Sequence, residues 1–286
     1  MKLRGLFVGL TTIDIHYLVD TFPTTNAKMV TGDFAMTVGG LATNGAITFA
    51  HLGGNSHLLS AIGQHPFTPF IEGELHQHHV VCTDLSPTAT QLPTVSSIVT
   101  THGGHRAIIY TMSSPTSSSS DAIWIAHHED YDVVLVDGFN MDTCCTVALQ
   151  AHACGIPVVL DGGSWKEGME RLLPFVDSAI CSEQFRSPDG GDEETVLAYL
   201  ARQGVSYRGI TRGEQPIIYS TPEGTGEIAI EPVQVVDTLG AGDILHGAFC
   251  FYYAADSSFV PALLQASRVA TLSCQTFGTR SWMKDG

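Results

Sequence analysis

The sequence predicts an α/β fold in which helices cover both faces of a parallel β-sheet and a second, small sheet projects as a lid. Two observations lead to this prediction. From residue 133 onward, short apolar runs alternate with helical stretches, which is typical of crossovers in a parallel sheet. Between residues 28 and 112 the strand-like runs have mixed polarity instead, so they suit an exposed sheet better than the buried layer of an α/β core.

The N-terminal half contains one buried strand, one helix and three strands of the small sheet. The helix ends at the pair Gly53-Gly54, a helix stop signal. The last two strands flank His102-Gly103-Gly104-His105, which indicates a hairpin turn. In chain order the buried strand, an exposed strand, the helix and the two hairpin strands are expected at Gly5–Leu10, Lys28–Val38, Leu41–Leu52, Thr94–Thr101 and Arg106–Met112. A Ser/Pro-rich loop follows at Ser113–Ser120.

The C-terminal half shows the alternation of strands and helices. Strands are expected at Val133–Val136, Ile156–Leu160, Ser178–Cys181 and Ser206–Thr211, with antiparallel strands within Ile217–Val235. Helices are expected at Met141–Ala153, Lys166–Leu173, Glu193–Arg202, Ala241–Ala255 and Val260–Cys274. The chain contains no internal repeat and no long linker. We therefore expect one domain over residues 1–286, with a lid formed by segments near 11–38 and 94–112.

Composition narrows the class of protein. The chain has 286 residues, of which 44% are hydrophobic and 15% charged, and this favours a folded protein over a disordered one. Its 13 basic and 29 acidic residues give a net charge of −16, which argues against nucleic acid and anionic membranes as partners. A multiply anionic substrate is also disfavoured, unless cations are concentrated at its site.

The cysteines and the N-terminus predict a cytoplasmic protein. The seven cysteines are odd in number and show no Cys-x-x-Cys spacing, so neither a disulfide framework nor a zinc site is expected. The first four residues run directly into a strand-like segment, whose apolar stretch is too short for a signal peptide or a membrane span. His76, His78 and His79 lack a nearby acid or cysteine that would complete a metal site.

The most informative stretch runs from Val236 to Asp243, reading Val-Asp-Thr-Leu-Gly-Ala-Gly-Asp, and an apolar helix follows it. Small residues at a helix start let backbone N–H groups converge on an anion, and the helix dipole adds positive charge. Asp243 at the end of this turn is well placed to accept a proton while negative charge develops beside it. The combination indicates phosphoryl transfer to a hydroxyl group, and the alternative is that Asp243 only caps the helix.

Five separated segments give the chain a resemblance to a known family. They are Gly9 to Asp14 with Leu18-Val19-Asp20 and Phe22-Pro23, the pair Gly39-Gly40 with Asn44, Gly104 to Ile109, Asp137-Gly138-Phe139-Asn140, and Asp237 to Asp243. In these segments the sequence resembles the ribokinase-like carbohydrate kinases of the phosphofructokinase B type, and most of all their ketohexokinase branch. The resemblance implies a three-layer Rossmann-like sandwich with a β-sheet lid, and ATP-dependent phosphorylation of a sugar hydroxyl.

The resemblance also implies roles for particular residues. Asp243 would be the general base, and backbone N–H groups of Gly240, Ala241 and Gly242 would form the anion hole. The residues implied to contact the sugar are Asp14, Asn26, Gly39, Gly40, Asn44 and Arg106. Those implied to lie near the nucleotide are Thr211, Gly213, Asp237, Cys274 and Gly278, with a monovalent cation such as K⁺ close to Asp237. Mg²⁺ would neutralise the phosphates, which so acidic a protein cannot do by itself.

Some positions depart from the family pattern. Ser182-Glu183-Gln184-Phe185 stands where many members carry an Asn-x-x-Glu motif, so Glu183 would act on Mg²⁺ only through water. Asn26 and Leu41 replace an acid and an Asn of ketohexokinase, and this puts fructose as the substrate in doubt. The favoured hypothesis is a kinase for a free sugar. The alternatives are a nucleoside kinase, a phosphosugar kinase and a non-catalytic sugar- or nucleotide-binding protein. The open edges of a lid sheet suggest a homodimer through the lid.

Overall fold

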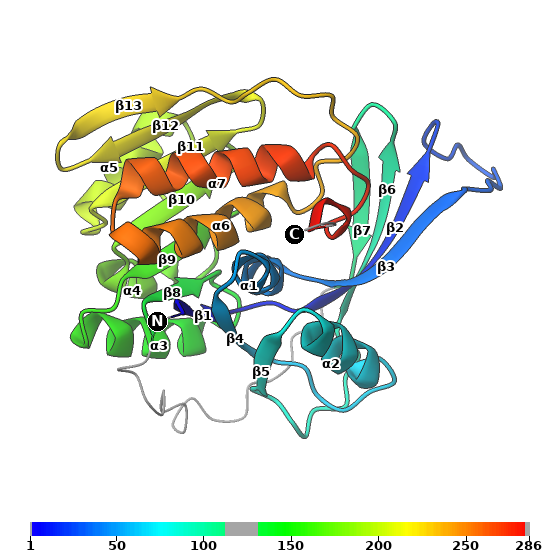
Figure 1. Ribbon diagram of the computed structural model, residues 1–286, viewed down its shortest axis with the longest axis horizontal. Coiled ribbons are helices and arrows are strands. Elements are labelled where there is room, and N and C mark those ends of the chain that lie inside the picture. Colours follow the sequence, from blue (N-terminus) through cyan, green and yellow to red (C-terminus); the bar gives the residue numbers. More distant parts are fainter. Residues whose placement is uncertain (1, 112–130, 284–286) are drawn as a thin grey trace.

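The computed structural model describes residues 2–111 and 131–283, which form two β-sheets with helices around the larger one (Figure 1). The larger sheet has the strand order β13-β12-β11-β10-β9-β8-β1-β4-β5, and the smaller has the order β3-β2-β6-β7. We call the smaller sheet the lid; it stands to the side of the larger sheet in Figure 1. The expected loop at 113–120 lies outside the described residues.

The strands and helices have the following bounds. The strands of the larger sheet are β1 (Arg4–Val8), β4 (Asn55–Ser60), β5 (Val80–Asp84), β8 (Val133–Val136), β9 (Val158–Gly162), β10 (Ser178–Ser182), β11 (Tyr207–Arg212), β12 (Gln215–Thr221) and β13 (Gly224–Ile228). The lid strands are β2 (Thr12–Val19), β3 (Asp33–Gly39), β6 (Thr94–Thr101) and β7 (Arg106–Tyr110). The helices are α1 (Leu41–His51), α2 (Thr68–Gln77), α3 (Met141–Ala153), α4 (Met169–Leu172), α5 (Glu193–Arg202), α6 (Ala241–Asp256) and α7 (Phe259–Ser273), with short 3₁₀ helices at Leu173–Phe175 and Ser281–Met283.

The larger sheet is the middle of three layers. Successive side chains of a strand point to opposite faces, so in β1 Leu6 and Val8 enter one core while Phe7 enters the other. The core with Phe7 contains residues of α1, α2, α6 and α7, and the core with Leu6 contains residues of α3, α4 and α5. Burial on both faces explains why these strands are continuously apolar. Among the helices that the structure describes, none is long and apolar enough to cross a membrane.

The sequence located the strongly patterned elements better than the weak ones. The expected bounds of β6, β8, α3 and α5 agree with the structure, whereas the run Ile217–Val235 is strand only as far as Ile228. Of the expected exposed strand at 28–38, only the part from Asp33 onward is strand. Strand β4 was missed because its sequence, Asn-Ser-His-Leu-Leu-Ser, is mostly polar, yet it pairs in parallel with β1 and β5 inside the sheet.

The topology determines where a ligand can bind. Strand β1 has β4 on one side and β8 on the other. The chain adds β4 and β5 on one side of β1 and then crosses to the other side to form β8. Ligands of open α/β sheets bind at such a switch point, beyond the carboxyl ends of the strands. Strand β2 begins only four residues after β1 ends, at Val8 and Thr12, so the lid is attached at this same edge.

Candidate active site

The helix α6 begins directly after the glycine-rich turn, as the sequence predicts. Gly240 precedes the first helical residue with a φ of 69°, a left-handed backbone conformation that suits glycine, and Ala241 starts the helix. The N–H groups of the first turn have no acceptors within the helix, because no turn precedes them. Asp243 is the third residue of α6, so its carboxylate lies beside these donors.

One cavity lies between the lid and the carboxyl edge of the larger sheet. Its volume is about 510 Å³, within the usual range for small-molecule sites. Polar groups of Thr12, Asp14, Asn44, Ser96, Lys166 and Asp243 line it, together with Gly40 and Gly240. We call this the first cavity.

A second cavity of about 650 Å³ lies on the other side of the glycine-rich turn. Of the residues that the sequence assigns to the nucleotide, Thr211, Gly213 and Cys274 line it. Gly240 and Asp243 border the first cavity, while Ala241 and Gly242 border the second. The start of α6 therefore separates two cavities and contributes to both, as a site that transfers a group from one ligand to another requires.

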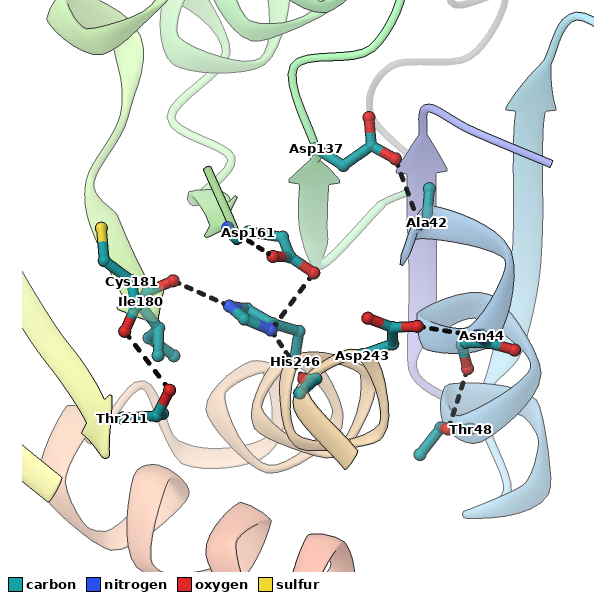
Figure 2. A network of polar contacts seen from close by, with 12 residues as sticks. Ala42, Asn44, Thr48, Asp137, Asp161, Ile180, Cys181, Thr211, Asp243 and His246 are labelled. Atoms are coloured by element: carbon teal, nitrogen blue, oxygen red, sulfur yellow. Dashed lines mark hydrogen bonds and ion pairs between the residues drawn. The ribbon is translucent and has the colours of Figure 1, made fainter. Parts of the chain in front are cut away.

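Asp243 is held by a hydrogen bond from a different part of the chain. The Asn44 Nδ2 atom donates to Asp243 Oδ2 at 2.7 Å, and Figure 2 shows the two side chains pointing toward one another from α6 and α1. Burial, and next the nearby negative charge of Asp161, raise the pKa of the Asp243 carboxyl to about 7. A carboxylate with a pKa near neutrality can both accept and release a proton at physiological pH.

Asp14 occupies a space that only glycine leaves open. The residue is buried, its Oδ1 accepts a 2.8 Å hydrogen bond from Thr12 Oγ1, and burial raises the pKa of its carboxyl. A Cβ atom at Gly39 would lie 1.9 Å from Asp14 Oδ2. At Gly40 the φ of 102° and the carbonyl oxygen of Leu10, 2.2 Å from an added Cβ, exclude a side chain as well. The pair Gly39-Gly40 thus lets Asp14 face the first cavity.

Asp137 joins the ends of two strands to the start of α1. Its Oδ2 accepts hydrogen bonds from the N–H groups of Leu10 at 2.8 Å and Ala42 at 3.2 Å, and its Oδ1 accepts one from Phe139 at 2.8 Å. Figure 2 shows the bond to Ala42. Burial raises the pKa of this carboxyl to about 6. The sequence analysis named Asp137 as part of a family segment and assigned it no role. The structure shows that it connects the loops at the switch point.

Comparison with known proteins agrees with this architecture. The sequence pattern of the family described as pfkB family carbohydrate kinase matches residues 4–285. The chain belongs to the pfkB family of carbohydrate kinases. It is thereby a phosphotransferase with an alcohol group as acceptor, as the sequence predicts.

Individual relatives are distant but cover the whole length. The ribokinase of Lactococcus lactis is 25% identical over 284 residues, covering 96% of this chain and 92% of the relative. An adenosine kinase from Sinorhizobium meliloti has a similar structure, with a TM-score of 0.80, 18% identity and coverage of 98% and 96% of the two chains. Arabidopsis thaliana ribokinase, solved with ribose and ATP, gives a TM-score of 0.72 at 20% identity with all of both chains covered. The expected ribokinase-like fold is confirmed, while the ketohexokinase branch stays a prediction.

Asn26, Arg106 and Glu183 are expected site residues that do not themselves line either cavity of this carbohydrate kinase. Asn26 is exposed in the connection between β2 and β3. Arg106, on β7, directs its Nη1 atom to Thr238 Oγ1 at 2.9 Å, and Thr238 lines the second cavity rather than the first. The exposed Glu183 follows β10, and its N–H group donates to the carbonyl oxygen of Thr211 at 2.9 Å.

Asp237 is hydrogen-bonded to backbone groups on both sides of its carboxylate. Its Oδ1 and Oδ2 accept hydrogen bonds of 2.9 Å from the N–H groups of Leu239 and Gly278, respectively. The Nδ1 atom of His16 lies 3.6 Å from Asp237 Oδ2, and both side chains are almost fully buried. The expected K⁺ close to Asp237 stays a prediction. Asp237 and Gly278 connect the glycine-rich turn to the segment after α7.

Four charged residues near the site were missed by the sequence reasoning. Lys166 lines the first cavity, with its Nζ atom 4.6 Å from the centre of the Phe139 ring. Asp161 and His246 lie beside Asp243, on the side away from Asn44, as Figure 2 shows, and Arg280 contacts Asn44. Asp161 and His246 lie in ordinary regular elements and Lys166 and Arg280 in connections, where a single ionisable residue gives no sequence signal of its own, so only the three-dimensional arrangement reveals these four.

Proposed function

We propose that the protein transfers the terminal phosphoryl group of ATP to a hydroxyl of a free sugar, a ketohexose-like or related monosaccharide, with Asp243 as general base. The observation that supports it most strongly is the position of the α6 start between the two cavities. The sugar would occupy the first cavity and the nucleotide the second, so that the hydroxyl and the phosphate meet at Gly240 to Asp243.

The residues at this point suit the chemistry. Asp243 would accept the hydroxyl proton while the hydroxyl oxygen forms a bond to the terminal phosphorus and the bond to ADP breaks. The first-turn N–H groups of α6 would stabilise the negative charge on the transferring group. The Arg106 guanidinium, beside Thr238 at the second cavity, is placed to assist with the phosphates rather than with the sugar.

We propose that Mg²⁺ binds together with ATP and needs few ligands from the protein. Among the residues that the structure describes, no cluster of three or more His, Cys, Asp or Glu could hold a metal ion. This fits Mg²⁺ that arrives with ATP, because such an ion keeps most of its ligands as water and phosphate oxygens. Glu183, exposed beside Thr211, remains the carboxylate that we propose to reach it through water. Mg²⁺ would supply charge neutralisation of the phosphates.

The polar part of the first cavity suits a neutral polyol. Asp14, Thr12 and Ser96 offer acceptors and donors on neighbouring lid strands, which is the arrangement that vicinal hydroxyls require. Lys166 is the one cationic side chain among the described residues lining this cavity, and it already contacts Phe139 and the Ser164 carbonyl. These features favour a free sugar over a phosphosugar.

A nucleoside is the second candidate, favoured by the apolar wall of the first cavity. Leu41, Ile108 and Tyr110 line the cavity and could contact a base. The structural similarity to an adenosine kinase fits the same reading. A nucleoside would present its ribose hydroxyl to Asp243 in the same way as a free sugar.

The test is ADP release from Mg-ATP with a panel of free ketoses, aldoses, nucleosides and sugar phosphates. We expect a signal that depends on a free sugar and is absent from Asp243→Asn. A signal with nucleosides alone would select the second candidate, and a signal with sugar phosphates alone would contradict both. No signal with any acceptor, while ATP still binds, would leave a binding protein as the remaining alternative.

We also propose a homodimer through the lid. Along the lid strands, residues alternate between the face toward the first cavity, which carries Asp14, and an outer face with Tyr17, Phe34, Met36 and Ile109. Phe34 and Ile109 on that outer face are 56% and 78% exposed, and exposed apolar groups of this kind often mark interfaces. Analytical ultracentrifugation of the wild type and of Phe34→Glu with Ile109→Glu tests it, since a wild-type monomer would refute the dimer.

A cytoplasmic location is part of the same proposal. All seven cysteines carry free thiols in the structure, which suits a reducing compartment. Fractionation of cells that express the tagged protein would check this.

A further inference from the structure

Arg280 is a buried cation that joins three parts of the active site. It lies after α7, and its side chain is 13% exposed. Its Nη1 atom donates to Asn44 Oδ1 at 2.9 Å, and its Nη2 atom donates to the carbonyl oxygen of Val38 at 2.6 Å. Its Nε atom lies 3.6 Å from Oε1 of Glu74, whose Oε2 accepts a 2.8 Å hydrogen bond from the Val38 N–H group. Arg280 thus connects the lid strand β3, the helices α1 and α2, and the C-terminal segment.

The contact with Asn44 decides how the Asn44 amide is turned. A guanidinium group can only donate hydrogen bonds, so the amide atom that faces Arg280 must be the oxygen Oδ1. The amide nitrogen Nδ2 is then left to face Asp243, to which it donates at 2.7 Å. If the amide were reversed, a nitrogen would face the guanidinium and an oxygen would face the carboxylate, and both contacts would be repulsive. Arg280 therefore selects the orientation in which Asn44 favours ionised Asp243.

The charge of Arg280 acts in the same direction. Asp14, Glu74 and Asp243 are three carboxylates close enough to affect the pKa of the Arg280 guanidinium, which burial lowers and these acids raise. In return, Arg280 lowers the pKa values of Asp14 and Glu74, which burial raises. A buried cation among several acids reduces the cost of keeping them ionised. Without it, Asp14 and Asp243 would compete for protons at the same site.

We propose that Arg280 is a positioning residue for phosphoryl transfer, which holds the Asn44 amide so that Asn44 keeps the Asp243 carboxylate ionised and aimed into the first cavity. The proposal rests on the proposed function, since it assigns Asp243 the part of the base. It differs from a purely structural role of Arg280, in which the residue would only attach the C-terminal segment to the lid.

The experiment compares Arg280→Met and Arg280→Lys with Arg208→Met as a matched control. Arg208 is another part-buried arginine, bonded to Ser220 Oγ and the Val205 carbonyl, and none of these three residues lines either cavity. With the best acceptor from the panel, we expect Arg280→Met to lower kcat about tenfold or more while the KM for ATP stays within about twofold. Arg280→Lys keeps the positive charge but cannot donate to Asn44 and Val38 at once through a planar guanidinium, so its kcat should lie between those of Arg280→Met and the wild type. Thermal unfolding of each variant separates these effects from lost stability.

The pH dependence gives a readout that a structural role would not change. The charged groups around Asp243 are Asp161 on β9, His246 on α6, Asp14 on β2 and Arg280 itself. Removing the cation raises the pKa of Asp243, so the acidic limb of the kcat profile should move to higher pH in Arg280→Met. The ¹³C shift of the Asp243 carboxyl, assigned with Asp243→Asn, should show a higher titration midpoint even if no acceptor is turned over. A midpoint equal to that of the wild type in a folded Arg280→Met would overturn the proposal and leave the proposed function intact.

Discussion

The imidazole of His246 and the carboxylate of Asp161 form a buried pair next to the glycine-rich turn, with His246 Nδ1 3.3 Å from Asp161 Oδ2. The same Nδ1 atom lies 2.7 Å from the carbonyl oxygen of Gly242, and Nε2 lies 3.0 Å from that of Ile180 (Figure 2). Both ring nitrogens therefore face acceptors, and each must carry a proton to donate. With a proton on both nitrogens, the ring would balance Asp161 and hold the Gly242 peptide of the glycine-rich turn.

This pair yields a first prediction about stability. His246→Leu leaves the carboxylate of Asp161, 2% exposed, without the imidazole that faces it, and we expect the free energy of unfolding to fall by about 3–5 kcal/mol. The double variant Asp161→Asn with His246→Leu should recover part of this loss, because no unpaired charge remains. Chemical denaturation of the two single variants and the double variant measures the coupling. The exposed His152 on α3 provides the control, His152→Leu; equal losses in the single and double variants would argue against an ion pair.

The second prediction concerns Asp243 as the base. Asp243→Asn keeps the size of the side chain and an oxygen that can accept from Asn44 Nδ2, but it cannot take a proton. We expect kcat to fall by about 10²- to 10⁴-fold while the dissociation constants of sugar and ATP change little. Steady-state kinetics and calorimetric titration of each ligand would measure this. Turnover near that of the wild type would show that Asp243 is not the base.

The third prediction is the pH dependence of turnover. Because burial raises the pKa of Asp243 to about 7, the ionised form required of a base becomes dominant only above that pH. We therefore expect kcat to rise through about pH 7 and to level off at higher pH. Initial rates with saturating substrates between pH 5 and 9 would test the shape of the curve, and a kcat that is flat down to pH 5 would contradict it.

The same pKa shift predicts that the active site costs stability. A carboxyl whose folded-state pKa is raised from 3.8 to about 7 binds its proton more tightly when folded, so its contribution favours folding at low pH and is lost as the pH rises through 7. Asp243→Asn should therefore be more stable than the wild type at pH 8, by about 1–2 kcal/mol after allowance for the partial exposure of the site, and no more stable at pH 4. Urea denaturation at the two pH values measures the difference. Equal stability at pH 8 would mean that Asp243 is ionised without cost.

The last prediction uses the close approach of Gly39 to Asp14. The Cβ of Gly39→Ala would lie 1.9 Å from Asp14 Oδ2, so the carboxylate must move within the first cavity. We expect the KM for the sugar to rise about tenfold or more, with the KM for ATP nearly unchanged, because the second cavity lies beyond α6. Gly32→Ala is the matched control, since a Cβ there meets nothing within 4 Å. An unchanged KM for the sugar would show that Asp14 does not contact the sugar.

Local patterns were sufficient for much of the fold. The apolar run Val133–Val136, the mixed-polarity strand Thr94–Thr101 and the helix Met141–Ala153 carry their patterns in the sequence, and their bounds agree with the structure. Strand β4 could not be found in this way, because its position between two parallel partners, and not its composition, makes it a strand. The glycine-rich string was recognisable because a turn that leads into a helix and an acid at its end follow one another along the chain.

The sequence by itself therefore determined the fold class, the family and the acid at the start of α6, since these depend on residues close together in the chain. Only the tertiary structure decided that Arg280 turns the Asn44 amide toward Asp243, that His246 contacts both Asp161 and Gly242, and that Arg106 donates to Thr238. These contacts join segments up to 236 residues apart. A charge becomes part of a site through the neighbours and the burial that folding gives it, and neither is present in the local sequence.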